Sequence, residues 1–310
     1  MINRELIRIK IVQLVYAYYL NGGKSLDIAE KELITSLSKG YQLYNHLLGL
    51  ILAITNEERL RYDILVQRAE REGKERPSSR FAYNRFAAQL EENEQLRSNL
   101  DSYGLAWRDN VEFVRGLCTM IEQSETYNDY MSATENDYNA DREVWRKLYK
   151  QIIGNNESLY SILEEKSLYW NDDKDVVDSF VLKTIKRFDP AKKGEQELLP
   201  EFKDDDDREY ALGLFRAALK NEREYQDMIQ QYSRNWQLSR MPFTDIVIMQ
   251  IALAEMLTFP AIPLSVTINE YVELSKSYST PRSAGYINGM LDTIARALHK
   301  EGRLWKQIEK

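Results

Sequence analysis

The densest run of apolar residues in the chain lies between Asp245 and Leu257. Apolar side chains fall on nearly every side of the helix that this run would form, which is typical of a helix buried on most of its faces. Pro260 and Pro263 follow closely, and proline ends helices because it lacks a backbone N–H and disfavours helix in the preceding residue. We therefore predict a buried helix that other helices must surround.

Two amphipathic helices are predicted directly after it. Thr267 is expected to begin the first, because Glu270 follows three residues later in the arrangement of a capping box. Thr280 and Pro281 are expected to begin the second, since proline's missing N–H costs nothing at the first position of a helix. Three short helices so close together must bury one another's apolar faces. The stretch 243–298 is therefore predicted to form a helical subdomain.

The rest of the chain also shows helical spacing of its apolar positions. Asn3 is expected to cap a first helix that ends near Leu20, where Asn21-Gly22-Gly23 follows. The further expected helices span residues 26–38, 41–71, 81–100, 111–130, 141–170 and 175–188. Residues 189–206 contain two prolines and a glycine and are the best candidate for a linker. The predicted fold class is all-α.

Composition narrows the possible chemistry. The chain has 310 residues, of which 43% are hydrophobic, so it is long enough for one large or two ordinary folded domains. One cysteine (Cys118) and two histidines (His46 and His299) exclude a disulfide framework and leave no conventional zinc site. No glycine-rich loop follows a strand, and no nucleophile is paired with a histidine. We expect a non-catalytic protein without metal or cofactor.

The distribution of apolar residues and charge bears on location and partners. No apolar run reaches the roughly 18 residues of a membrane span, so we expect a cytoplasmic protein with no membrane partner. The net charge of −7 argues against broad attraction to nucleic acid, although a local basic face remains possible. Arg4, Arg8 and Lys10 lie on the first helix with Tyr16, and arginine and tyrosine can contact phosphates and stack on bases. The alternative is ordinary solvated charge beside half-buried tyrosines.

A second candidate surface lies on the last predicted helix. Gly289, after Asn288, is expected inside this helix, where glycine costs about 1 kcal/mol relative to alanine. Its presence suggests close approach by backbone or by a ligand, and Arg282 and Ser283 could join the same surface. The alternative is close packing between helices, which small residues also permit.

Three blocks of the C-terminal region resemble a known family. They are residues 251–256 (IALAEM), residues 267–276 (TINEYVELSK) after Pro263, and residues 286–292 (YINGMLD). In this order and spacing they resemble the C-terminal half of NusB, the bacterial transcription antitermination factor. Residues 12–16 (VQLVY) are similar to the core of that family's first helix.

The resemblance implies a fold and a domain organisation. The family folds as two perpendicular three-helix bundles, and an ordinary member has about half the length of this chain. We therefore expect a NusB-like core formed by residues 1–40 and 207–310, with residues 41–206 as a large helical insertion. The first junction stays open, because residues 41–71 could equally be the family's third helix.

The resemblance also implies a function. The family binds boxA RNA and pairs with a small-subunit ribosomal protein, called NusE in that role, within transcription elongation complexes that make ribosomal RNA. The residues expected to contact RNA are Arg4, Arg8, Lys10, Tyr16, Arg282, Ser283, Asn288 and Gly289. The family usually has lysine at Gly285 and arginine at Gln250, so two positive charges are missing from the expected RNA surface. A NusB-derived scaffold that binds protein without specific RNA is the alternative, and an RNA-modifying enzyme is a third hypothesis that no catalytic group supports.

Overall fold

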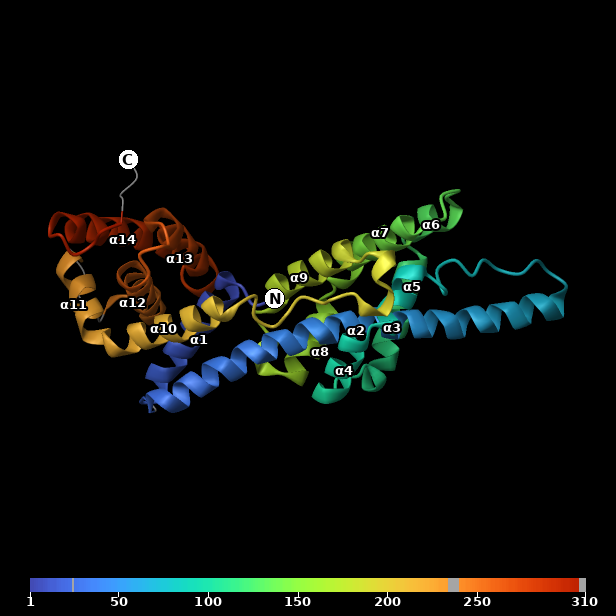
Figure 1. Cartoon of the computed structure of the whole chain (residues 1–310), viewed down its shortest axis with the longest axis horizontal. Helices are drawn as coiled ribbons and strands as arrows, with labels where there is room; N and C mark the ends of the chain where they lie inside the picture. The colour runs from blue at the N-terminus through green and yellow to red at the C-terminus, as the bar shows by residue number, and fades with distance from the viewer. Residues whose placement is uncertain (24, 234–239, 307–310) are drawn as a thin grey trace. The chain divides into compact units, whose positions relative to one another are not determined.

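The computed structural model describes residues 1–23, 25–233 and 240–306. The predicted all-α fold is confirmed: within the described residues there is no β-sheet, and the only β pairing is one bridge between Ile2 and Phe202. The helices form two compact units (Figure 1). Unit 1 contains Met1 and Ser38–Glu201, and unit 2 contains Ile2–Leu37 and Phe202–Lys310.

Unit 2 is built around α12 (Phe243–Thr258), in which residues 245–256 are all buried. This confirms the prediction of a helix covered on most sides. α12 packs against α1 (Arg4–Leu20), α10 (Asp205–Lys220), α11 (Glu222–Tyr232), α13 (Leu264–Tyr278) and α14 (Ser283–Lys300) (Figure 1). Because α12 contacts five helices, its side chains form the centre of this unit's core.

The ends of the helices in unit 2 follow the expected capping chemistry in some places and not in others. The Asn3 side chain accepts a hydrogen bond from the N–H of Leu6, which confirms the predicted start of α1. The Asp204 carboxylate caps α10 in the same way. The capping box predicted at Thr267 and Glu270 is wrong, because α13 begins at Leu264 and both side chains make contacts with other helices.

Unit 1 is built on α2 (Leu26–Glu72), whose residues up to Leu37 belong to unit 2. The two helices expected at 26–38 and 41–71 are therefore one, since no proline interrupts them and a helix tolerates a single glycine such as Gly40 at about 1 kcal/mol. The other elements of unit 1 are α3 (Arg85–Glu92), α4 (Glu94–Tyr103), η1 (Arg108–Asn110), α5 (Val111–Glu122), α6 (Glu125–Ser132), α7 (Tyr138–Leu148), η2 (Tyr149–Ile153), α8 (Glu157–Lys166), η3 (Leu168–Trp170), α9 (Lys174–Arg187) and η4 (Pro190–Glu195).

Three helices expected to be continuous are divided in the structure. Asn93, Ser124 and Asn156 each begin a new helix, with a side-chain oxygen that accepts a hydrogen bond from a backbone N–H three residues later. Side-chain oxygens of this kind replace the missing helical partners at an N-terminus. The predicted helices 81–100, 111–130 and 141–170 were therefore too long.

The segment 189–206 packs on unit 1 for much of its length and does not behave as an open linker. Leu198 and Leu199 are buried, and the Leu199 N–H donates to the Tyr44 hydroxyl at 3.3 Å. Among the described helices, none combines the length and apolar character that crossing a membrane requires.

His46 of α2 lies at the centre of a buried aromatic cluster in unit 1. Its ring stacks on Trp107 with centroids 4.2 Å apart, and Trp170 lies 5.5 Å away. Neither ring nitrogen has a hydrogen-bond partner within the described part of the chain. Burial, assisted by the positive charge of Lys166, lowers the pKa of His46 to about 3.

We predict that His46 makes the stability of the protein fall in mild acid. In the unfolded state the histidine has a pKa near 6.5, whereas the pKa of folded His46 is far lower. Below about pH 6.5 the unfolded state therefore binds a proton that the folded state does not bind, and the free energy of unfolding decreases as the pH falls. The loss attributable to His46 should reach about 2 kcal/mol between pH 7 and pH 5. Urea unfolding of the wild type and of His46→Phe at both pH values measures it. The same pH dependence in both proteins would contradict the prediction.

Candidate nucleic-acid interface

An aromatic patch lies where α1 meets the start of α12 in unit 2. Tyr16 is half-buried, and its ring lies 5.4 Å from that of Phe243, whose side chain is 37% exposed. Tyr19 adds an edge-to-face contact with Phe243 at 5.9 Å. Tyr16, Tyr19 and Phe243, the aromatic patch, present partly exposed rings of the kind that unstacked bases contact.

A cavity of about 220 Å³ lies beside the N-terminal end of α14 and just before α12. We call it the arginine cavity, and its walls are Arg240, Met241, Pro242, Asp245, Thr280, Arg282, Ser283 and Tyr286. Both arginines are exposed, and the Tyr286 hydroxyl lies 3.7 Å from the sulfur of Met241. Arginine forks onto phosphate and tyrosine stacks on bases, so the cavity has groups for both parts of a nucleotide.

Ser283 forms part of this wall but is only 2% exposed. Its hydroxyl donates to Asp245 Oδ2 at 2.9 Å and lies 2.8 Å from the Thr280 hydroxyl. These bonds hold the connection between α13 and α14 against the start of α12. The expected exposed position of Ser283 is therefore corrected: its visible role is to fix the cavity wall.

Arg8 is also not on the surface. Its side chain is 4% exposed and forms two hydrogen bonds with Glu255 of α12, from Nε to Oε2 at 2.8 Å and from Nη2 to Oε1 at 3.0 Å. Nη1 donates to Glu270 of α13 at 3.0 Å. The expectation that Arg8 forms an exposed basic face is corrected by this burial, because its guanidinium already links three helices.

Hydroxyl groups complete the surroundings of Glu255. Thr267 donates at 2.8 Å and Tyr271 at 3.1 Å, and Tyr210 of α10 also donates to the same carboxylate. Burial disfavours the charged carboxylate, but the hydrogen bonds from Arg8, Tyr210 and Thr267 outweigh it and lower the pKa of Glu255. The group is therefore an ionised carboxylate in the core, held by paired charge and hydroxyl donors.

The other two cations of the expected N-terminal cluster are separated by the fold. Arg4 is 46% exposed, lies 3.8 Å from Asp207 and covers the Tyr210 ring at 4.9 Å. Lys10 is only 1% exposed, so its expected surface position is also corrected. Of the three, only Arg4 presents its charge to solvent.

Two further residues expected to contact RNA lie on the exposed side of α14, beyond the residues that line the arginine cavity. Asn288 and Gly289 are both exposed, and nothing lies within 4 Å of where a Cβ of Gly289 would be. The alternative of close packing between helices is therefore wrong for Gly289 in the described structure. Gly285 has the same open surroundings one turn earlier.

Gln250, where the family usually has arginine, lies in the interior. It is 0% exposed, and its Nε2 donates to the Tyr19 hydroxyl at 2.6 Å and to the Ala218 carbonyl at 2.8 Å. The interpretation that this position had removed a surface charge is wrong. Gln250 instead holds Tyr19 of the aromatic patch by a hydrogen bond from the interior of unit 2.

Phe243, Arg240 and Tyr286 were not among the site residues expected from the sequence. Phe243 was taken as the first residue of the helical subdomain, and its exposure follows only from its place at the start of α12. Arg240 carries no periodic signal because it precedes the helix. The one available clue was that two arginines and two aromatic residues lie close to predicted helix starts.

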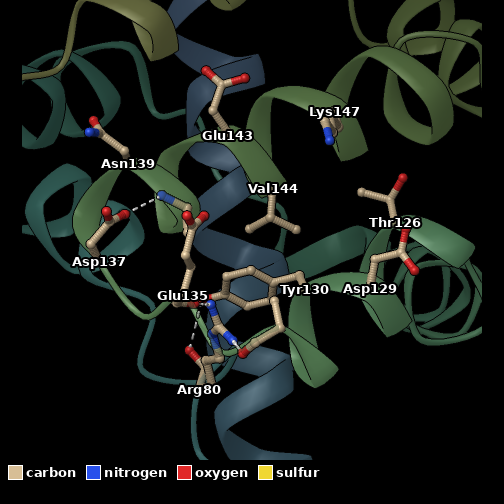
Figure 2. Close-up of a pocket in the computed structure, with 12 residues that line it drawn as sticks. Arg80, Thr126, Asp129, Tyr130, Glu135, Asp137, Asn139, Glu143, Val144 and Lys147 are labelled. Carbon is tan, nitrogen blue, oxygen red and sulfur yellow. Dashed lines mark hydrogen bonds between the residues drawn. The ribbon is translucent and has the colours of Figure 1, made fainter.

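A larger cavity, of about 530 Å³, lies in unit 1 beside α6 and α7 (Figure 2). Four carboxylates stand on its wall: Asp129, Glu135, Asp137 and Glu143. The Arg80 guanidinium is already engaged, since it donates to the Ala133 carbonyl at 2.7 Å and covers the Tyr130 ring at 4.1 Å. Within the described residues, neither these carboxylates nor any other three His, Cys, Asp or Glu side chains are placed so that they could hold a metal ion. This acidic wall would repel phosphate, so we do not place a nucleic-acid site there.

Comparisons with known proteins identify the family. The sequence model of the NusB family matches residues 179–296. The transcription antitermination protein NusB of Salinibacter ruber is 37% identical over 108 residues, which cover 35% of this chain and 68% of that protein. The NusB of Natranaerobius thermophilus is 34% identical over 110 residues, covering 34% of this chain and 79% of that protein. The chain belongs to the NusB family. The solved structure of T. maritima NusB is 27% identical, covers 44% of this chain and 84% of its own, and superposes with a TM-score of 0.29.

Membership of the NusB family confirms the resemblance found in the sequence and supports a role in transcription antitermination. The matched regions cover most of these relatives but about a third of this chain, so this NusB-family member is longer. The family match begins within α9 of unit 1 and ends within α14. The similarity is therefore not confined to unit 2.

We predict that Glu255→Gln destabilises unit 2 by about 3–5 kcal/mol, because the buried Arg8 charge then loses its doubly hydrogen-bonded carboxylate and keeps only the partly exposed Glu270 as a partner. Arg8→Gln should cost a similar amount, and the double variant should cost less than the sum of the two. Denaturant unfolding of all four proteins measures the coupling. Additive losses would show that the pair is not energetically coupled.

We predict that Gly289→Ala raises stability by up to about 1 kcal/mol, because the site has room for a methyl group and alanine favours helix. Thermal unfolding tests this, with Gly285→Ala as the matched control at the other open position of α14. A loss of stability in Gly289→Ala would restore the packing interpretation.

Proposed function

We propose that this protein is a non-catalytic, cytoplasmic RNA- and protein-binding factor in transcription antitermination, acting in ribosomal RNA transcription. Family membership supports the general role. Within the proposal, boxA-type RNA and a small-subunit ribosomal protein in the NusE role are the partners, as part of a transcription elongation complex.

The observation that carries the RNA proposal is the arginine cavity beside the aromatic patch. Arg240 and Arg282 are exposed on a cavity that also contains Tyr286, and Phe243 follows its wall residue Pro242 directly. We propose that the arginines bind phosphates while Tyr16, Phe243 and Tyr286 contact bases. Asn288 and Gly289 would continue this surface along α14, where the missing Cβ permits close approach.

Replacing the two cavity arginines should weaken RNA binding through lost phosphate contacts. Each contact to single-stranded RNA contributes about 0.7 to the slope of log K against log salt concentration. Arg240→Gln/Arg282→Gln should therefore flatten the slope by about 1.4 for boxA RNA. Fluorescence anisotropy across a salt series measures this.

The control for this prediction is Arg296→Gln, which removes an exposed arginine that pairs with Asp292 near the other end of α14. It should leave the slope unchanged. An unchanged slope in the double variant, with the fold intact by circular dichroism, would remove the arginine cavity from the proposal.

The partner proposal is supported by charge. A net charge of −7 hinders RNA binding but favours encounter with a basic ribosomal protein. The helices α12, α13 and α14, which pack against one another and contain the three blocks of family similarity, would serve as the platform for docking. The second candidate function is a scaffold that binds the ribosomal protein but no specific RNA sequence. The burial of Arg8 and Lys10 favours it.

We predict that the purified protein binds the NusE-type ribosomal protein without RNA, and that boxA RNA strengthens the complex only modestly. Titration calorimetry at physiological salt measures both. Absence of detectable binding when both proteins are folded would exclude the partner proposal.

The domain organisation is also a proposal. We propose that the NusB-like core consists of unit 2, which approximates the expected segments 1–40 and 207–310, together with residues 179–201 of unit 1. Because the family match begins at residue 179, the added part is best drawn from Ser38 to about residue 178, shorter than the 41–206 expected from sequence.

A further inference from the structure

A cluster of basic residues lies in unit 1, apart from the residues proposed above to bind RNA. It consists of Lys183, Lys186, Arg187, Lys192 and Lys193. All five side chains are exposed, and none of them pairs with a carboxylate in the described part of the chain. Only one carboxylate, that of Asp189, lies among them in sequence, and it caps the following turn by accepting from the Ala191 N–H at 2.9 Å. In a chain of net charge −7, this segment is strongly positive.

The first part of the cluster lies on α9. Val181, Thr184 and Ile185 form part of the buried side of this helix. Lys183 and Lys186 are three residues apart and lie on the opposite, exposed side. Packing of α9 therefore fixes the direction in which these two charges point.

The second part of the cluster lies on the loop that follows, and this loop is held firmly. Gln89 Nε2 donates to the carbonyls of Asp189 and Lys193, at 2.9 and 2.8 Å. Asn93 Nδ2 donates to the Gln196 carbonyl at 2.6 Å. Gly194 lies so close to α3 that a Cβ there would be 2.7 Å from the Glu92 carbonyl oxygen.

The backbone of Lys193 is strained. Its φ of 48° makes it the only non-glycine residue with positive φ in the described chain. Such a conformation persists only where the surrounding structure enforces it, and residues of this kind concentrate at functional sites. Glycine would fit the backbone without strain, yet this position carries a lysine whose side chain is exposed.

We propose that α9 and this loop, the lysine loop surface, bind the phosphate backbone of RNA without reading its bases. The inference extends the proposed function by adding a second, sequence-independent contact in unit 1. Five exposed cations that are close together in sequence, on a packed helix and a hydrogen-bonded loop, suit a polyanion, because each phosphate contact releases a counterion. A basic ribosomal protein would be repelled by the same charges, so RNA is the partner that the surface fits.

Two full-length double variants with equal loss of charge test the surface. Lys186→Gln/Lys193→Gln removes two cations from the lysine loop surface, and Arg71→Gln/Arg108→Gln removes two exposed cations elsewhere in unit 1. The probe is a 12-nucleotide oligouridylate, which carries phosphates but no boxA sequence. The first variant should flatten the salt slope by about 1.4, and the control should leave it unchanged. Equal effects of both variants, or none in the first, would overturn the proposal.

The strain at Lys193 offers a second test. Lys193→Gly keeps the backbone conformation but removes both its strain and the positive charge, so it should raise the melting temperature while weakening oligouridylate binding about two- to fivefold. A purely structural lysine would give a more stable protein with unchanged binding, which contradicts the proposal. Weaker binding of the ribosomal protein with unchanged oligouridylate binding would contradict it too, by assigning the surface to a protein partner.

These results are separable from the proposed function. Preference for boxA over a scrambled RNA tests the arginine cavity and the aromatic patch. Oligouridylate binding that depends on the lysine loop surface, without boxA preference, would support this inference and contradict the proposed specificity. A preference for boxA together with an unchanged salt slope in Lys186→Gln/Lys193→Gln would support the proposed specificity and contradict this inference.

Discussion

The ion pair between Arg8 and Glu255 is the constraint on which unit 2 depends. It joins α1 to α12 inside the core, and Glu270, Tyr210 and Thr267 extend it to α13 and α10. Removing two charges from water is costly, and their attraction offsets that cost only when the remaining hydrogen-bonding groups are satisfied. The three hydroxyl donors around Glu255 meet that condition. The pair therefore specifies which faces of these helices meet, and the start of α12 and its neighbours are positioned as a result.

The sequence could predict the features of this structure that depend on local patterns, but not those that depend on contacts between distant residues. The buried helix at 245–257 followed from apolar residues on all its sides, and the start of α1 followed from Asn3. The divisions at Asn93, Ser124 and Asn156 were missed because these residues are polar and common on helix surfaces, and only tertiary packing makes them caps. Arg8 and Glu270 were misplaced for a related reason. Local patterns suggested a solvated cation and a capping carboxylate. Both residues instead belong to one hydrogen-bonded network, in which Arg8 is more than 240 residues away in the chain from its partners Glu255 and Glu270.

Burial of Arg8 moves the proposed RNA contacts away from the N-terminal cluster. The exposed groups suited to a nucleotide are at the starts of α12 and α14, where the Asp245–Ser283 hydrogen bond fixes the wall of the arginine cavity. Unit 1 adds the lysine loop surface, in which a strained backbone displays charge on a rigid support. Under these proposals, the contacts that read the RNA sequence belong to unit 2, and both units contribute phosphate contacts, which would allow a protein of negative net charge to bind RNA. Base contacts specify while phosphate contacts position, as in other nucleic-acid complexes.

Ultraviolet crosslinking of boxA RNA to the full-length protein, followed by mass spectrometry of the crosslinked peptides, tests the central claim most directly. The account predicts crosslinks at Tyr16, Phe243 or Tyr286 that a boxA competitor removes and a scrambled RNA does not. Crosslinks concentrated around the acidic cavity of α6 and α7, or on the N-terminal turn of α1 with none at these three aromatic residues, would contradict it.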